Sequence, residues 1–282
     1  MSEVVLNDNR ANMKGSYYVE KFQGGLLFDS STKNGFTVIC CFDFDQDISG
    51  FKLTVLSQSC ISSISEDDFW MAYKDKYLNA VAVVPESNRF LISTQHRRTL
   101  DTTLQLFDAD LKPKFRKLTC LAKVDMPSFK KIVCFSKELY GALTKEGQFK
   151  TLHYKGSIPL FRKAQIVCMN QKHGATKFRD IAVNPTYKNK HGFCHRFALL
   201  SDAGDLFVTD LVEFTKPTLL LAYTLSDVDH VKNFYYENDE LRIVYCDDGD
   251  TEIISRIDIY KDNIGALVFQ SLIKQPARKQ ND

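Results

Sequence analysis

Apolar residues occur along this chain in short runs of about 5 to 8 residues that are rich in Val, Ile, Phe, Tyr and Thr. Gly, Asp, Asn or Ser bound most of these runs, and this combination is typical of β-strands separated by turns. One short helix is predicted, at residues 66–77, and it contains Trp70, the only tryptophan of the chain. The pattern therefore predicts an all-β protein.

A turn of similar sequence recurs between neighbouring predicted strands. Gly147, Gly204 and Gly249 each follow a small polar residue and two turn residues, and Gly35 closes a fourth turn in the form Asn-Gly. Glycine adopts left-handed backbone angles without steric cost, which suits the last position of a hairpin turn. We therefore expect a hairpin at each of these glycines.

A longer pattern groups the predicted strands into repeats. Residues 80–93 form a strand, a turn led by proline and a second strand, and a third strand ends in Phe107-Asp108. Residues 180–210 repeat this order, and residues 124–154 repeat it more weakly. The order resembles a divergent WD-type β-propeller blade, whose first strand ends in Pro, whose second ends in Ser or Thr, and whose third ends in an aromatic residue plus Asp.

The spacing of the repeats agrees with this resemblance. Pro85, Pro127 and Pro185 lie 42 and 58 residues apart, which brackets the period of roughly 40 to 50 residues of propeller blades. The resemblance implies a small or incomplete β-propeller of about five blade-like repeats of four antiparallel strands, and a β-sandwich is the alternative. The expected units lie near residues 20–60, 78–111, 121–155, 178–212 and 230–262. The expected domain organisation is a flexible N-terminal segment at 1–14, a propeller at 15–265 and a C-terminal strand or tail at 266–282.

The amino-acid composition indicates the class of protein and the compartment in which we expect it. With 44% hydrophobic and 26% charged residues, the 282-residue chain has an ordinary globular balance. No apolar run approaches the roughly 18 residues of a membrane span, and the first ten residues are polar and charged. We expect an intracellular protein, nuclear or cytoplasmic and not secreted, with no membrane partner. Its eight scattered cysteines are then expected to be buried or partly buried thiols.

Charge is distributed in blocks that the net charge of +2 conceals. Residues 112–196 contain nineteen basic and four acidic residues, whereas residues 227–262 contain eleven acidic and four basic residues. Clustered Lys and Arg form an electrostatic footprint for phosphates or for an acidic protein surface. The candidate partner-binding residues are Lys112, Lys114, Arg116, Lys117, Lys130 and Lys131. The first four of these are expected in a loop that follows the strand ending at Asp108.

One group of residues has the chemistry of a zinc site. Cys168, His173, His191 and Cys194 offer two thiols and two imidazoles, which are ligands that Zn²⁺ prefers. Their spacing matches no standard zinc signature, so small buried cysteines and histidines in a loop are the favoured interpretation. We therefore expect no bound metal.

Catalytic motifs are absent from the sequence. It contains no Gly-x-Ser-x-Gly elbow, no phosphate-binding Gly-x-x-x-x-Gly-Lys loop and no dinucleotide-binding glycine motif. We therefore predict no enzyme activity and no cofactor. The favoured hypothesis is a non-catalytic protein-protein interaction scaffold, a subunit of a larger intracellular complex whose other proteins have an acidic surface. The alternative is a nucleic-acid-associated factor that contacts phosphates through residues 112–196.

Overall fold

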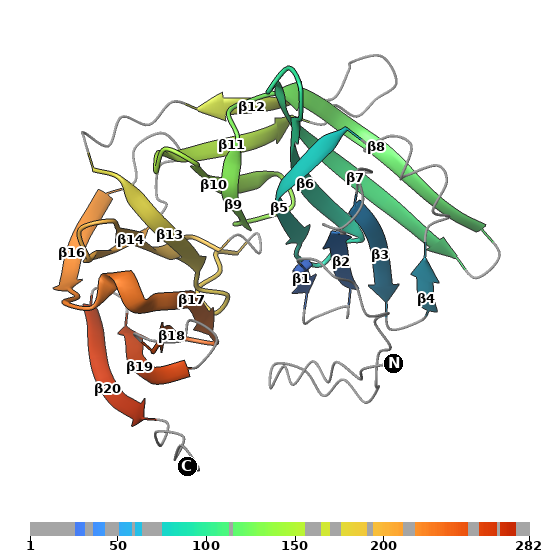
Figure 1. The fold of residues 1–282 in the computed structure, drawn as a ribbon. Coiled ribbons are helices and arrows are strands. Elements are labelled where there is room, and N and C mark those ends of the chain that lie inside the picture. The colour runs from blue at the N-terminus through green and yellow to red at the C-terminus, as the bar shows by residue number, and fades with distance from the viewer. Residues whose placement is uncertain are drawn as a thin grey trace, which may run out of the picture. The chain divides into compact units, whose positions relative to one another are not determined.

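The computed structural model describes most of the chain from residue 26 to residue 274. The described residues are 26–31, 36–42, 51–57, 60–63, 75–112, 115–155, 165–169, 176–190, 194–210, 218–247, 254–263 and 266–274. In this part the chain forms twenty strands and one 3₁₀ turn, η1 (Val228–His230). The strands assemble into five four-stranded sheets (Figure 1).

Each sheet takes four strands that are consecutive in the sequence. The first sheet contains β1 (Leu26–Ser31), β2 (Phe36–Phe42), β3 (Phe51–Ser57) and β4 (Cys60–Ser63). The second contains β5 (Lys76–Val84), β6 (Arg89–His96), β7 (Thr102–Lys112) and β8 (Phe115–Asp125). The third contains β9 (Phe129–Cys134), β10 (Leu139–Thr144), β11 (Phe149–Lys155) and β12 (Gln165–Met169). The fourth contains β13 (Phe178–Val183), β14 (Arg196–Ser201), β15 (Asp205–Asp210) and β16 (Thr218–Thr224). The fifth contains β17 (Val231–Glu237), β18 (Glu240–Cys246), β19 (Ile254–Asn263) and β20 (Ala266–Lys274).

The order of strands within the sheets establishes the fold class. Every sheet is an antiparallel meander, and the second strands β10 and β14 are buried at every position. A sandwich would connect its strands in Greek-key order between two sheets, so the alternative of a β-sandwich is wrong. The prediction of a small or incomplete β-propeller with five blades of four strands is confirmed, and four to eight blades are usual for this architecture.

Several predicted boundaries need correction. The expected units at 78–111, 121–155, 178–212 and 230–262 each ended before the fourth strand of the sheet, which is β8, β12, β16 and β20 respectively. The expected helix at 66–77 is wrong at its C-terminal end, because β5 begins at Lys76. Residues 66–74, with Trp70, lie outside the described residues. The described residues contain no α-helix.

The hairpin prediction is confirmed at Gly147 and Gly204. Their φ angles are +82° and +89°, in the left-handed region that glycine tolerates. The carbonyl oxygen of Gly147 accepts the Phe178 N–H at 2.8 Å, and that of Gly204 accepts the Leu225 N–H at 2.9 Å. Each turn therefore holds the chain near the start of the next sheet. Gly35 and Gly249 lie outside the described residues.

The chain divides into two compact units, residues 1–139 with 153–167 and residues 140–152 with 168–282. Within the second unit, the fourth and fifth sheets share an apolar core. Phe234 and Leu241 of the fifth sheet and Leu206 of the fourth are fully buried in it.

A buried ion pair joins these two sheets beside the core. The carboxylate of Asp262 accepts hydrogen bonds from Arg196 Nε at 2.6 Å, Tyr236 OH at 2.7 Å and Asn184 Nδ2 at 3.0 Å. Asp262 and Asn184 are completely buried, and Arg196 is 1% exposed. The guanidinium of Arg196 also donates to Asp210 Oδ1 at 3.4 Å. Both charges are therefore compensated where water cannot reach them.

The electrostatics of this cluster follow from its burial. Burial opposes the charged form of Arg196, but the hydrogen bond and the charge of Asp262 outweigh it and raise the pKa of the guanidinium above its usual value. Burial, reinforced by the charge of Asp262, raises the pKa of Tyr236 well above that of a free tyrosine. The cluster thus keeps a charged arginine and a neutral tyrosine around one carboxylate.

Replacing the two turn glycines by alanine should lower the stability of the fold by different amounts. A Cβ atom at Gly204 would clash with the carbonyl oxygen of Leu225, whereas one at Gly147 would meet its nearest atoms at 3.1 Å. Both positions have the same backbone strain, about 1 to 3 kcal/mol for a non-glycine residue. We expect Gly204→Ala to lower the free energy of unfolding by more than Gly147→Ala does, measured by denaturant titration. An unchanged midpoint for Gly204→Ala would contradict the turn geometry.

The buried pair predicts a second contrast. Arg179 and Asp229 also link β13 to the segment that enters the fifth sheet, at 3.3 Å, but 90% of the Asp229 side chain is exposed. Removing one partner of a buried pair costs about 3 to 5 kcal/mol, whereas an exposed pair contributes about 0 to 1 kcal/mol. We expect Arg196→Met to destabilise the fold strongly and Arg179→Met to change it little. If thermal and denaturant unfolding showed the same loss of stability for both variants, the buried pair would not be more important than the exposed one.

Candidate interaction surface

The basic residues that the sequence analysis selected are distributed over two sheets. Lys112 is the last residue of β7, and Arg116 and Lys117 are the second and third residues of β8. These two strands pair as far as Lys112 and Phe115. The expectation that this basic group occupies a loop is therefore wrong, because strand pairing continues beyond Asp108. Lys114 lies outside the described residues.

Lys130 and Lys131 lie in β9, at the edge of the third sheet. Both side chains are half-buried, and both have interaction partners within the chain. The two lysines and the β7–β8 hairpin thus belong to different sheets. A single continuous basic site formed by all six residues stays a prediction.

The zinc hypothesis stays untested at most of its positions. Cys194 is a buried free thiol, 5% exposed. The backbone of Cys168 lies in β12, while His173 and His191 lie outside the described residues. Within the described residues, no group of three or more His, Cys, Asp or Glu could hold a metal ion.

The cysteines agree only in part with expectation. Four described cysteines are free thiols: Cys134 and Cys194 are buried, Cys246 is half-buried and Cys120 is exposed. Cys120 lies on the outer strand β8, where its sulfur contacts the carbonyl oxygen of Ala122 at 3.4 Å. The expectation of burial is therefore wrong for Cys120.

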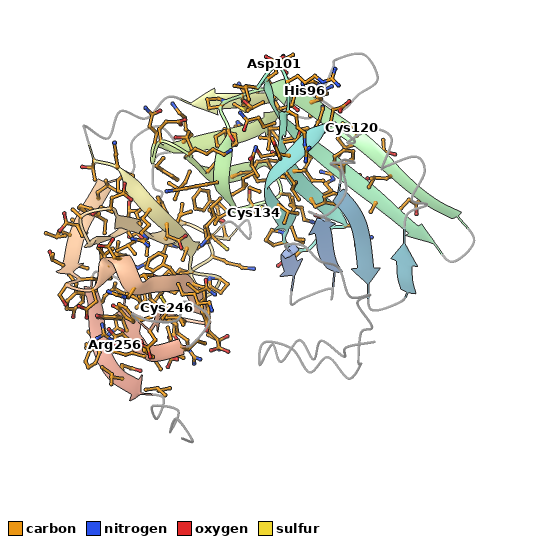
Figure 2. All side chains as sticks on the ribbon, in the orientation of Figure 1. His96, Asp101, Cys120, Cys134, Cys246 and Arg256 are labelled. Carbon is orange, nitrogen blue, oxygen red and sulfur yellow. The ribbon has the colours of Figure 1, made fainter. Side chains whose placement is uncertain are left out.

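The loop between β6 and β7 is a feature that the sequence analysis missed. Nδ1 of His96 accepts the N–H groups of Arg98 and Thr99 at 3.3 and 3.2 Å, and His96 N donates to Asp101 O at 2.7 Å. Figure 2 shows His96 and Asp101 together at the ends of these strands. Leu100 N donates to His96 O at 3.0 Å. The loop is therefore held in one conformation by its own hydrogen bonds.

Leu100 occupies an unusual position in this loop. Its φ angle is +61°, in the left-handed region that a branched side chain resists. Its side chain is 62% exposed, so packing in the fold does not compensate for the backbone strain. The nearby side chains of Arg97 and Arg98 are also accessible, and the Arg97 guanidinium lies 4.6 Å from the centre of the Tyr77 ring. The loop displays an apolar tip beside cationic groups.

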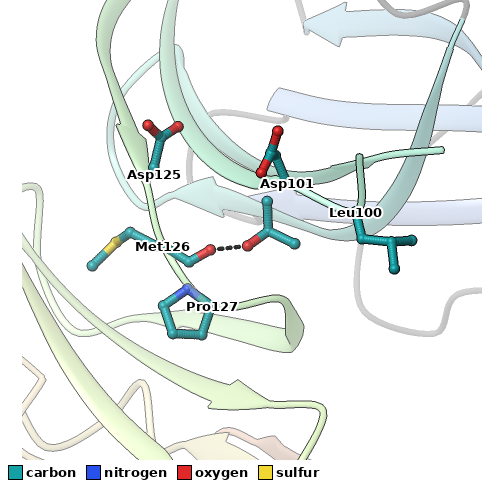
Figure 3. Close-up of a pocket in the computed structure, with 6 residues that line it drawn as sticks. Leu100, Asp101, Asp125, Met126 and Pro127 are labelled. Carbon is teal, nitrogen blue, oxygen red and sulfur yellow. Dashed lines mark hydrogen bonds between the residues drawn. The ribbon is translucent and has the colours of Figure 1, made fainter. Parts of the chain in front are cut away.

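A shallow hollow of about 610 Å³ lies beside this loop (Figure 3). Leu100, Asp101 and Thr102 line one side, and Asp125, Met126 and Pro127 line the other. The Thr102 hydroxyl donates a hydrogen bond to the Met126 carbonyl oxygen, which joins the two segments. The lining combines apolar surface with two accessible carboxylates, which suits contact with a protein segment better than enclosure of a small substrate.

Charges next to the hollow are partly balanced within the sheet. Burial lowers the pKa of Lys76 in β5, and repulsion by Lys123 lowers it further, while attraction to Asp125 opposes both effects. The carboxylate of Asp101 accepts a hydrogen bond from the Thr99 hydroxyl at 2.6 Å. No nucleophile paired with a general base is found among the residues that line the hollow. The hollow therefore presents two accessible carboxylates beside apolar surface.

Only part of this surface had a signal in the sequence. The run from His96 to Thr99 is polar and basic between two predicted strands, which marks a surface loop. The left-handed backbone of Leu100 had no such signal, because a glycine or asparagine is the usual sign of that conformation. The proximity of Asp125 and Asp101 arises from strand pairing between β7 and β8.

Comparisons with known proteins address the fold. No family model matches the chain, and no curated protein matches it. Among solved structures, Sqt1 from Chaetomium thermophilum, bound to the N-terminus of a ribosomal protein, is 13% identical with a TM-score of 0.54. The match covers 92% of this chain but 66% of Sqt1, slightly less than two thirds. A second structure of Sqt1 is 12% identical with a TM-score of 0.53, and covers 90% of this chain and 72% of the other.

The β-propeller domain of Cps50 (Swd1) from Myceliophteria thermophila is also similar. It is 9% identical with a TM-score of 0.51, over 91% of this chain and 74% of that domain. No helix in the described residues is long and apolar enough to cross a membrane. Sqt1 and Cps50 are WD-type β-propellers. At these identities the likeness concerns the fold alone, and the chain has a β-propeller fold that resembles the WD type.

Proposed function

We propose that this protein is a non-catalytic protein-protein interaction scaffold and a subunit of a larger intracellular complex. The observation that carries the proposal is the loop from His96 to Asp101. Hydrogen bonds fix its backbone, and its apolar tip, Leu100, is strained and exposed. A preorganised loop loses little conformational entropy on binding, so its contacts contribute fully to affinity.

The chemistry around the loop favours a protein partner. The exposed Leu100 and Pro127 provide apolar contact area, and the carboxylates of Asp101 and Asp125 line the same hollow. Arg97 and Arg98, both exposed, precede Leu100 in the loop. Protein interfaces combine an apolar centre with a polar rim in this way. Binding of a ribosomal protein N-terminus by the similar propeller Sqt1 supports the use of such a fold for docking proteins. The β7–β8 hairpin at Lys112 lies at the opposite end of β7 from this loop and is not part of the proposed docking surface.

The loop predicts the outcome of one substitution. Leu100→Asn removes the apolar tip and places a residue there that tolerates left-handed angles, so we expect the thermal midpoint to be kept. Proteins captured by the tagged parent from nuclease-treated extract should be lost. Leu220→Asn is the matched control, since Leu220 is an exposed leucine, 54% accessible, on β16. Equal capture by the parent and Leu100→Asn, quantified by mass spectrometry, would contradict the proposal.

The excess of basic residues over 112–196 favours nucleic acid as the alternative partner. Each phosphate contact changes the slope of log K against log salt by about 0.9 for duplex DNA and about 0.7 for single strands. If residues 112–117 contact phosphates, replacing Lys112, Lys114, Arg116 and Lys117 by Glu should reduce this slope by about 3 units. Fluorescence anisotropy with an RNA oligonucleotide measures it, and the thermal midpoint reports the fold. An unchanged slope would remove these residues from a nucleic-acid site.

A further inference from the structure

The hollow beside the loop from His96 to Asp101 carries a carboxylate on each of its two sides. Asp101 immediately precedes β7, and Asp125 is the last residue of β8. Both side chains are exposed, and their carboxylates point to the same side in Figure 3. The six residues that line the hollow include no lysine, arginine or histidine. The hollow therefore presents two negative charges and no positive one.

Both carboxylates have capacity for further hydrogen bonds. Asp101 accepts one, from the Thr99 hydroxyl at 2.6 Å. Asp125 is attracted to Lys76, but within the described part of the chain no hydrogen bond or ion pair reaches its carboxylate. A carboxylate has two oxygens with about four acceptor positions. Most of the acceptor positions in the hollow are thus open to a donor from outside the chain.

The cations next to the hollow do not pair with its carboxylates. Lys76 is half-buried, and burial together with repulsion by Lys123 lowers its pKa, so its charged form is disfavoured. The guanidinium of Arg97 lies 4.6 Å from the centre of the Tyr77 ring. These groups leave the charges of the hollow available to a ligand.

We propose that the hollow binds one lysine or arginine side chain of the partner protein, an inference that rests on the proposed docking function of the loop. Such a side chain has an apolar stem and a cationic head. The head donates to the carboxylates of Asp101 and Asp125, and the stem contacts Pro127. Hydrogen bonds between ionised groups are roughly twice as strong as those between neutral ones. The same carboxylates repel phosphate, so nucleic acid does not suit this hollow.

The size and surroundings of the hollow restrict the occupant further. Its volume of about 610 Å³ falls within the roughly 300 to 1,000 Å³ of small-ligand sites, so a whole side chain fits. A bound metal ion suits it less, since the described residues offer no group of three potential ligands. The exposed Arg97 and Arg98 precede Leu100 in the loop and would repel additional positive charges. We expect a single basic residue flanked by apolar residues, rather than a basic run.

Two peptides that differ in one group test the charge of the occupant. The probe is acetyl-Gly-Leu-Arg-Leu-Gly-amide, and its control has citrulline, which keeps the shape of arginine without its charge. Titration of the ¹⁵N-labelled full chain should shift the amide signals of residues 100–102 and 125–126 saturably. The citrulline peptide should bind at least fivefold more weakly. Added salt should weaken binding of the arginine peptide and leave that of the citrulline peptide unchanged.

Variants of the hollow locate the effect. Asp101→Asn combined with Asp125→Asn removes both charges and keeps the shape, and an asparagine oxygen still accepts from the Thr99 hydroxyl. The preference for arginine over citrulline should disappear with an unchanged thermal midpoint. The control combines Asp202→Asn with Asp229→Asn, at two exposed acids of the second unit, and should keep the preference. Equal binding of both peptides, binding of neither, or a preference that survives in the hollow variant would overturn the proposal.

Capture from nuclease-treated extract separates this inference from the proposed function. Partners lost with both Leu100→Asn and the hollow variant support the two together. Partners lost with Leu100→Asn but kept by the hollow variant would overturn recognition of a cation and leave the loop as a docking site. Partners kept by both variants would overturn the proposed function as well.

Discussion

The junction of the fourth and fifth sheets depends on the hydrogen bonds that the carboxylate of Asp262 accepts. This carboxylate is completely buried near the end of β19 and accepts hydrogen bonds from Arg196 of β14, from Asn184, which follows β13, and from Tyr236 of β17. An uncompensated charge at this depth would cost several kcal/mol, so the Asp262 carboxylate and the Arg196 guanidinium require each other. Because both groups accept only a narrow geometry, they fix how β14 meets β19, and the apolar core around Phe234 packs within that arrangement.

An arginine opposite an aspartate occurs between the second and third strands of two sheets. Arg196 opens β14 and lies opposite Asp210 of β15, and Arg89 opens β6 and lies opposite Asp108 of β7. The Arg89–Asp108 pair is 3.7 Å apart and accessible to water, so it is expected to contribute little stability. The same kind of cross-strand pair is thus solvated in the second sheet and part of a buried hydrogen-bond network in the fourth. Burial, rather than residue type, sets the energetic difference.

Two kinds of surface follow from a fold built of meanders. Loops such as the one with Leu100 lie where strands end, and hydrogen bonds can hold them rigid without using core residues. Outer strands such as β20 end each sheet and expose backbone groups to any strand that can approach. Recognition of a different protein suits the first kind of surface, which has mixed charge and a fixed shape. In β20 the register with β19 shifts at Gln270, and such a bulge interrupts the regular edge of the strand.

The sequence by itself determined the strand content, the repeat and its turn glycines, because these are local properties that a few neighbouring residues decide. Gly147 and Gly204 could be placed from a pattern of four residues. It did not place the basic residues near Lys112 correctly, because strand pairing between β7 and β8 continues past the turn signals. Only the tertiary structure brought Asp262 to Arg196, 66 residues away in sequence, and gave Leu100 its left-handed backbone. Such features depend on contacts between distant segments, and the energy of a charge depends on burial that no local pattern records.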